Sequence, residues 1–223
     1  RLIFNNGITN NSSNVFNAGG ATFNTNAQVT GGTGSFSFTQ VTVTGVTVTN
    51  NGAFTAATAL GGTGQFSNAA TGTLNLSGTA ASCSITTLAN AGIINRSNTG
   101  TTTTALANFT NTGTINITGS GAITGITNNA AGIVNHSGSS TITSFNNATA
   151  TSTLNISTTP TVPTITTLTV SAAGNTVNYS GAGAQTVIVV AYSNLILSGS
   201  GAKSIATGTS VAGNLSIAPS GSA

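Results

Sequence analysis

Acidic side chains are missing from this chain, whose 223 residues include neither Asp nor Glu. The only basic residues are Arg1, Arg96 and Lys203, and His136 is the single histidine. Charged residues make up 1% of the sequence, whereas a typical globular domain contains about 25%. The net charge of +3 therefore reflects the missing acids and does not indicate a basic surface.

The absence of carboxylates excludes most enzyme chemistry. Glycoside hydrolysis ordinarily needs two Asp or Glu residues, and a Ser-His-Asp triad would lack its acid. Calcium sites usually need carboxylate oxygens, and one histidine with one cysteine, His136 and Cys83, cannot build a zinc site. The sequence therefore predicts a protein that is not an enzyme and has no catalytic residue, no cofactor and no metal.

Several kinds of partner are excluded as well. Three scattered cations cannot neutralise a run of phosphates, so we expect no nucleic-acid binding. No run of 18 apolar residues exists, so we expect no membrane-spanning helix. The single cysteine, Cys83, excludes an internal disulfide. Because the chain opens at Arg1 without a signal-like region, we expect any secretion signal to have been removed or to lie outside this sequence.

The residues that are present indicate a folded chain. Gly, Ser, Thr and Asn dominate the sequence, which can signal low complexity. Disordered segments, however, have little apolar content and high net charge. Here hydrophobic residues amount to 38%, the mean hydropathy is positive at +0.27, and the apolar residues recur at regular intervals.

One hexapeptide pattern, apolar and polar residues around a central Asn, recurs from residue 72 onward. Its copies are GTLNLS at 72–77, GIINRS at 92–97, GTINIT at 113–118, GIVNHS at 132–137, STLNIS at 152–157 and NTVNYS at 175–180. Successive copies of the Asn are separated by 20, 21, 19, 20 and 23 residues. A second kind of segment, in which apolar residues recur at the same spacing, ends at Asn90, Asn128 and Asn147. Each repeat of about 20 residues therefore carries at least two strands.

The residue types favour strands over helices. Thr, Val, Ile and Phe suit a pleated sheet, while the helix formers Glu and Met are absent. Apolar and polar residues alternate over 41–44 and 46–49, with Gly45 between them as an expected bulge.

A period near 20 residues predicts an all-β fold, a β-solenoid in which stacked coils bury a face that no single coil could bury. We expect two stacked columns along its axis. The core column comprises Leu74, Ile94, Ile115, Val134, Leu154 and Val177. The structural Asn ladder comprises Asn75, Asn95, Asn116, Asn135, Asn155 and Asn178, which we place at a coil corner with amides hydrogen-bonded up the axis.

A third column mixes apolar and polar residues, and this mixture suggests that its side chains reach solvent at least in part. Its members are Leu76, Arg96, Ile117, His136, Ile156 and Tyr179. Each Asn of the predicted ladder is also the Asn of an Asn-x-Ser/Thr sequon, so a surface column open to glycans is the alternative interpretation.

The repeat is clear only in part of the chain. Residues 71–223 form the predicted β-solenoid. Residues 1–70 are a less regular β region that holds seven of the nine phenylalanines. Terminal repeats of solenoids are often atypical, so we interpret this region as a cap or an assembly element.

The C-terminal part carries the most specific motif. It reads YSGAGAQTV at 179–187, and related spacing returns around Tyr192, Leu195 and Lys203. This pattern resembles the repeats of large secreted surface proteins of the Bacteroidota type, and the GTLNLS coils resemble passengers of filamentous adhesins and autotransporters. Over about residues 70–223 the resemblance implies an extracellular, adhesive or structural role, and it carries no catalytic residue onto this chain.

Three functions fit these observations. The first is a structural subunit of an extracellular filament, in which copies of the chain stack head to tail because few charges protect the strand edges. The second is a fragment of a long cell-surface adhesin that binds a glycan or a protein. The third is ice binding through Thr42, Thr44, Thr47 and Thr49.

The filament hypothesis also predicts a weak response to pH. Since only His136 and the chain termini titrate, we expect assembly to persist from about pH 3 to 9.

Overall fold

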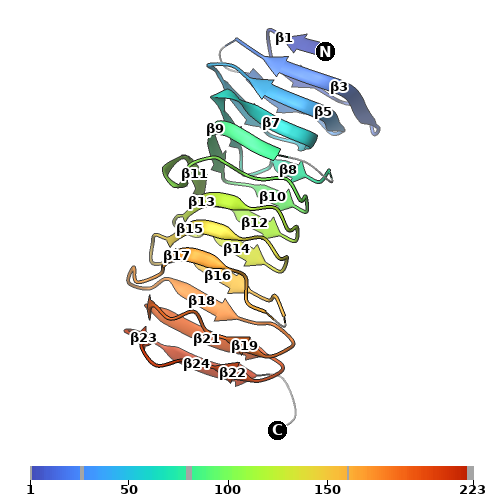
Figure 1. Ribbon diagram of the computed structural model, residues 1–223. Coiled ribbons are helices and arrows are strands. Elements are labelled where there is room, and N and C mark those ends of the chain that lie inside the picture. The colour runs from blue at the N-terminus through green and yellow to red at the C-terminus, as the bar shows by residue number, and fades with distance from the viewer. Residues whose placement is uncertain (1, 26–27, 79–81, 160, 220–223) are drawn as a thin grey trace.

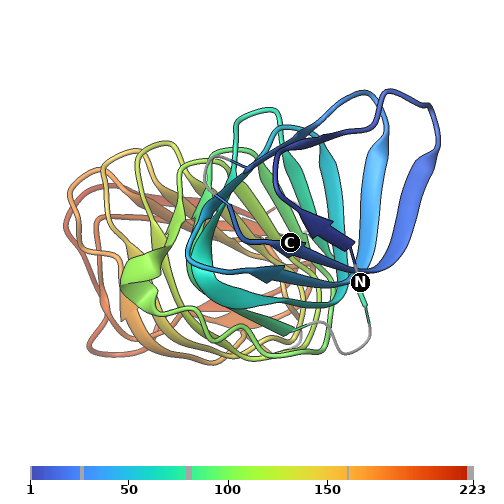
Figure 2. The ribbon, with the colours of Figure 1, turned by 90° about the horizontal axis from the view of Figure 1, so that it is seen from above.

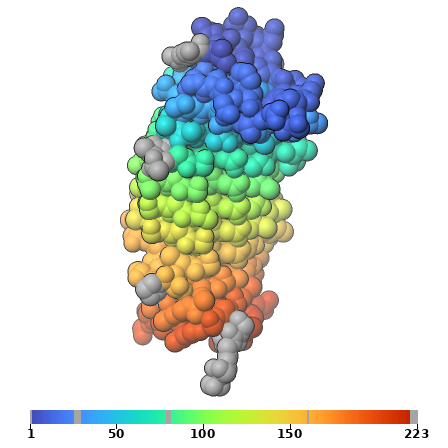
Figure 3. Space-filling model, turned by 90° about the vertical axis from the view of Figure 1, so that its right-hand side faces the viewer, coloured from blue at the N-terminus to red at the C-terminus, as the bar shows by residue number. Residues whose placement is uncertain are grey.

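The protein is a parallel β-solenoid of about ten turns, as the sequence predicts. The computed structural model describes residues 2–25, 28–78, 82–159 and 161–219. Its coils stack into a rod with the first and last coils at opposite ends (Figures 1 and 3). Seen along its axis, the chain winds around a closed interior (Figure 2).

Each coil contributes strands to three faces, which we call A, B and C in the order in which the repeat passes them. Face A carries the repeated hexapeptides. From residue 73 onward its strands are β8 (Thr73–Leu76), β10 (Ile93–Arg96), β12 (Thr114–Ile117), β14 (Ile133–His136), β16 (Thr153–Ile156), β18 (Thr176–Tyr179), β21 (Asn194–Gly199) and β24 (Leu215–Pro219).

Faces B and C are formed together by strands that bend from one face to the next. These strands are β9 (Ser82–Asn90), β13 (Ile123–Asn128), β15 (Ile142–Asn147) and β17 (Ile165–Thr169), with β11 (Phe109–Asn111) on face C after the short helix η1 (Leu106–Asn108). Two short pairs complete the last coils: β19 (Gln185–Thr186) with β22 (Lys203–Ser204), and β20 (Ala191–Tyr192) with β23 (Ser210–Val211).

The first third of the chain follows the same path. Its strands are β1 (Leu2–Phe4), β2 (Ile8–Thr9), β3 (Val15–Phe23), β4 (Gln28–Gly31), β5 (Ser35–Val43), β6 (Thr47–Asn50) and β7 (Ala53–Asn68). Phe16, Phe36, Phe54 and Leu74 are consecutive partners in one register, so the sheet runs from these strands into the clear repeats without a break. Whether the region also acts as a cap or assembly element stays a prediction.

The interior is lined by alternate residues of each strand, as the period of two requires. All six residues of the predicted core column are buried, with exposures of 0 to 1%. Toward the N-terminus, phenylalanines take over this role. Their rings contact one another, with centroids 5.2 Å apart for Phe4 and Phe23 on neighbouring coils and 5.3 Å apart for Phe54 and Phe66 within one coil. Wide aromatic side chains therefore fill the N-terminal coils, and aliphatic ones fill the rest.

The expected bulge at Gly45 is wrong. The strand β5 ends at Val43 and β6 begins at Thr47, so Gly45 lies in the turn between face B and face C. Its φ of 64° is the left-handed conformation that glycine adopts readily, and this explains its place in the turn. The four threonines around it lie on two different faces and do not form one flat Thr grid.

Candidate functional site

A buried column of asparagines lies at the corner where face C turns into face A. We call it the corner ladder, and its members are Asn50, Asn68, Asn90, Asn111, Asn128 and Asn147. From Asn50 to Asn128, each Nδ2 donates to the Oδ1 of the next member along the chain, over 2.7 to 2.8 Å. The Thr30 hydroxyl donates to Asn50 Oδ1 over 2.6 Å at the N-terminal end of the column.

The same amides also hold the turn of the backbone. Asn111 Nδ2, for example, lies 3.0 Å from the carbonyl oxygen of Gly113 in its own turn and 3.3 Å from that of Ile133 in the next coil. A tight turn leaves such carbonyls pointing inward, where an unpaired polar group would be costly. The corner ladder satisfies these groups and clamps each coil to its neighbour.

The Asn ladder predicted from the sequence is a different column. Its residues pair in register at the middle of the face A strands and point outward, so the predicted corner position is wrong. All six side chains are half-buried. Consecutive amides are hydrogen-bonded over 2.8 to 2.9 Å from Asn75 to Asn155, and Asn178 Oδ1 accepts from the Ser198 hydroxyl over 2.8 Å. We call this column the outer ladder.

The outward position bears on the sequons. A glycan would be attached to the Nδ2 atom of the sequon Asn. In Asn95, Asn116, Asn135 and Asn155 this atom already donates a hydrogen bond to the amide of the preceding ladder residue. Strands in a sheet lie about 4.8 Å apart, so glycans on adjacent coils would collide. The geometry favours a hydrogen-bonded ladder over a row of glycans.

The expectation that the third column reaches solvent is wrong. Its six members, from Leu76 to Tyr179, are all buried, with exposures of 0 to 1%. Arg96 lies in this column between Leu76 and Ile117, in a chain that has no carboxylate side chain to pair with it.

Neutral acceptors hold the Arg96 guanidinium instead. Nε donates to the Thr102 hydroxyl over 3.0 Å, Nη1 to the Ser140 hydroxyl over 2.9 Å, and Nη2 to the Gly100 carbonyl over 2.7 Å. Burial lowers the pKa of Arg96 to about 10, so the side chain keeps its charge at neutral pH. Nη2 also donates to the Ala122 carbonyl of the coil in between over 3.3 Å. The side chain is therefore an interior cross-link among three coils rather than a surface charge.

His136 is buried two coils further along the same column. Its Nε2 lies 3.0 Å from the Ser140 carbonyl oxygen, and Nδ1 lies 3.5 Å from the Thr158 hydroxyl. Burial lowers the pKa of His136, the Ser140 carbonyl opposes this shift, and the Arg96 charge adds to it. The imidazole is therefore neutral at pH 7, and it fits its column as a polar replacement for Ile117 and Ile156.

Cys83 is buried on face B, where its Sγ lies 4.0 Å from the Thr104 hydroxyl. Burial raises the pKa of this thiol. Cys83 and His136 contact different partners, so this thiol and this imidazole are not hydrogen-bonded to each other.

We expect the Cys83 thiol to be unreactive in the folded protein. A buried thiol with a raised pKa offers little thiolate. Titration with a chromogenic thiol reagent at pH 8 should give essentially no reaction without denaturant and one thiol per chain in guanidinium. Rapid modification of the native chain would contradict the buried position.

Two further polar groups occupy the C-terminal coils. The hydroxyls of Tyr179 and Tyr192 lie 2.9 Å apart, and Tyr192 also donates to the Ile188 carbonyl over 2.6 Å. Lys203 Nζ donates to the carbonyls of Gly181, Gly183 and Ser200 over 2.8 to 3.0 Å. The described cations are thus bound to carbonyl and hydroxyl oxygens.

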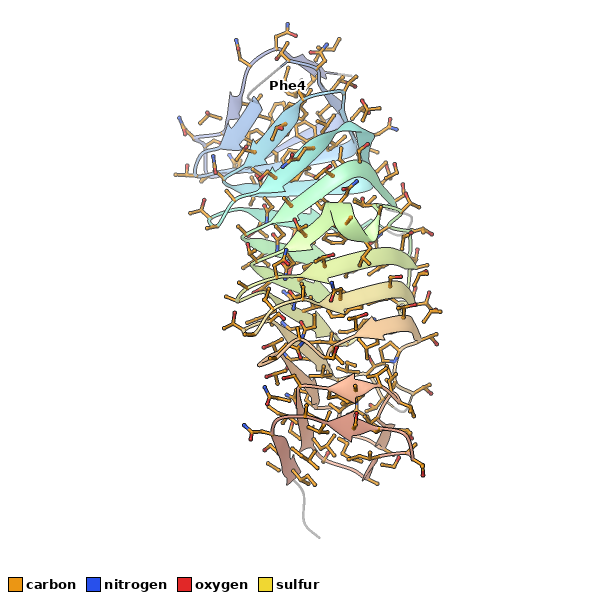
Figure 4. All side chains as sticks on the ribbon, turned by 90° about the vertical axis from the view of Figure 1, so that its left-hand side faces the viewer. Phe4 is labelled. Atoms are coloured by element: carbon orange, nitrogen blue, oxygen red, sulfur yellow. The ribbon has the colours of Figure 1, made fainter. Side chains whose placement is uncertain are left out.

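The two ends of the described rod expose apolar side chains. The N-terminal coil exposes Leu2, Ile3, Val15 and Phe16, and the last coils expose Val189, Ile205, Leu215 and Ile217. A cavity of about 230 Å³ lies at the N-terminal end, where Phe4, labelled in Figure 4, lines it together with Ile8, Thr9, Asn10, Phe16 and Phe36.

These features define the chain as a β-solenoid. No known protein family matches it, and no curated protein or solved structure shows significant similarity to it. In the part of the chain that the structure describes, no group of three or more His, Cys, Asp or Glu side chains could hold a metal. The described residues also include no helix long and apolar enough to cross a membrane.

Proposed function

We propose that this chain is a non-enzymatic structural subunit of an extracellular filament, in which copies stack head to tail through the ends of the solenoid. The distribution of exposed apolar side chains carries this proposal. Among the residues that the structure describes, ten large apolar side chains are exposed, and eight of them lie in the first coil or the last coils. The sides of the rod expose only Ile93 and Ile133 among these ten.

Within the described residues, the outer strand edge at each end of the rod has no partner strand. The face A part of β3, Val15–Ala18, pairs with β5 on one side, and β24 pairs with β21 on one side. Proteins commonly protect such edges with charged residues or proline. The strand β3 has no charged residue, and β24 has only Pro219 at its last position. Edges of this kind favour pairing with another strand, and a head-to-tail contact propagates as a filament.

The interior supports a mechanical role. The polar side chains of the corner ladder and those around Arg96 are engaged in structural hydrogen bonds, and the chain has no carboxylate side chain for acid or base catalysis. The sequence resemblance to filamentous adhesins, autotransporter passengers and surface repeat proteins supports an extracellular or cell-surface location. The partner in the filament is another copy of the chain.

The test is a charge placed at one end of the rod. Ile217 is 64% exposed on the C-terminal edge, and Ile133 is 37% exposed on the side. In a filament the Ile217 side chain would be buried, which stabilises the contact by about 1.5 to 3 kcal/mol. Each 1.4 kcal/mol corresponds to about a tenfold change in affinity. We expect Ile217→Lys to raise the critical concentration for filaments at least about tenfold, as measured by sedimentation and negative-stain microscopy.

The matched control is Ile133→Lys, which makes the same chemical change on the side of the rod. It should leave the critical concentration within a factor of two of the unmodified chain, and circular dichroism should show both variants folded. Equal effects of the two variants would contradict end-to-end stacking. Short monomeric rods from the unmodified chain would also overturn it, and would favour the adhesin fragment, in which further coils cover the same ends.

A further inference from the structure

We infer that the contact between copies continues the register of the solenoid itself, with β24 of one copy pairing in parallel with β3 of the next, Ser216 opposite Asn17 and Ile217 opposite Ala18. This inference rests on the proposed filament and names its interface. The occupant of each end is therefore a second copy of this chain, seated as the next coil.

The columns of the solenoid identify the partners. Following the strand pairings from coil to coil, Phe16 begins the inward column that ends at Leu215, and Ala18 begins the one that ends at Ile217. In the proposed contact, Leu215 stacks on Phe16 as Leu195 stacks on Leu215 within the chain. Both inward columns then continue with apolar residues across the junction.

The corner column matches in the same way. At the N-terminal end it begins at Ile8, which pairs with Thr30 ahead of the buried asparagines. At the other end Val170, Tyr192 and Val211 follow one another in register on face C. The amides thus stop short of both ends, and the proposed contact sets Val211 against Ile8 without burying an unpaired amide.

The cavity at the N-terminal end gives the large edge residues a place to lie. Phe4, Ile8 and Phe16 line this space of about 230 Å³. The column that ends at Ile217 begins with a small residue, Ala18. Ile217 and Leu215 are the exposed apolar side chains of the opposite edge. Large side chains at one edge therefore meet a hollow and a small side chain at the other, as adjacent layers of a packed core do.

The outward column permits a direct test of register. Asn17 and Ser216 are exposed and occupy the two ends of the column that contains the outer ladder. In the proposed contact their Cα atoms would be one strand spacing apart, about 4.8 Å. This separation lies within the range of about 4.4 to 6.8 Å that a disulfide spans. A chain carrying Asn17→Cys and Ser216→Cys, with Cys83→Ser to remove the native thiol, should form covalent ladders of multimers when its filaments are oxidised.

The matched control shifts one cysteine by two residues along β3. Gly19→Cys with Ser216→Cys places the Cα atoms about 8 Å apart in the proposed register, which is too far for a disulfide. A Cβ at Gly19 meets no atom within 4 Å, so the substitution is tolerated. We expect at least a tenfold lower yield of cross-linked multimers from this pair on a denaturing, non-reducing gel.

Three results are distinguishable. Filaments that cross-link through Asn17→Cys and not through Gly19→Cys support the register. Filaments that cross-link equally through both pairs, or only through the shifted pair, overturn the register and leave the filament standing. A chain that remains monomeric by sedimentation overturns the filament, and the register with it.

Discussion

Asn111→Ala should lower the free energy of unfolding by about 4 kcal/mol, while Asn116→Ala should lower it by at most about 1 kcal/mol. The two residues have the same chemistry and lie five positions apart in one coil. Asn111 belongs to the buried corner ladder, and Asn116 belongs to the half-buried outer ladder. The difference between them measures what burial adds to an amide ladder.

The physical reason lies in the partners that each amide leaves behind. Asn111 Nδ2 donates to Asn128 Oδ1 over 2.8 Å and to two backbone carbonyls, and Asn111 Oδ1 accepts from Asn90 over 2.7 Å. The two hydrogens of Nδ2 serve three acceptors, so removing the side chain costs the equivalent of about three hydrogen bonds, each worth about 1 kcal/mol net, and adds the cost of leaving buried groups unpaired. When the amide of Asn116 is removed, water can bond to Asn95 Oδ1 and Asn135 Nδ2 in its place because the column faces solvent.

Urea unfolding followed by circular dichroism would measure both values. Both variants should be made in the Ile217→Lys background, since assembly would otherwise add to the apparent stability. Equal losses for Asn111→Ala and Asn116→Ala would mean that burial adds nothing and would contradict the structural role assigned to the corner ladder.

The coil period could be predicted from the sequence because it repeats a chemical pattern. The hexapeptides fix the strands of face A, and the alternation of Leu74, Asn75 and Leu76 fixes which side chains point inward. The core column is therefore buried as predicted. The outward direction of Asn75 follows from the same alternation, since neighbours of an inward residue must point out.

The corner ladder was missed although its signal is in the sequence. Asn68, Asn90, Asn111 and Asn128 recur every 17 to 22 residues, each shortly before a glycine that begins the next hexapeptide. A ladder needs only a constant position in the coil and tolerates a variable loop. The stricter spacing of the hexapeptide asparagines correctly predicts a hydrogen-bonded ladder, but that ladder lies on face A and not at the corner. Position relative to the glycine turn identifies the corner.

The buried Arg96 and His136 could not be placed from residue type, because such residues are usually exposed. The register of their column places them inside, since Leu76, Ile117 and Ile156 occupy equivalent positions. Thr102 and Ser140 lie in the loops that follow the strands of Arg96 and His136. Their inward-facing hydroxyls accept hydrogen bonds from Arg96. A strict register therefore outweighs the usual preference of a residue type for solvent.

The buried histidine also changes the expected response to acid. Above about pH 6.5 the imidazole is neutral in both the folded and the unfolded chain, and the fold has its full stability. The pKa of His136 is lowered in the folded chain by burial, so below about pH 6.5 the unfolded chain takes up a proton that the folded chain does not. The free energy of unfolding should then fall by about 1.4 kcal/mol for each pH unit, and become constant once the folded chain is protonated too.

This prediction can be assigned to one residue because nothing else in the chain competes with it. The chain has no Asp or Glu and only one histidine. Urea unfolding of the Ile217→Lys variant at pH 4.5, 5.5 and 6.5 should show the loss, and the same series with His136→Ile, which matches Ile117 and Ile156, should be flat. A flat profile with His136 present would contradict its burial as a neutral imidazole, and an equal slope in both chains would place the acid-sensitive group elsewhere.

Filaments should accordingly persist above about pH 6.5 and weaken below it. This pH range is narrower at its acidic end than the range of about pH 3 to 9 expected from composition alone.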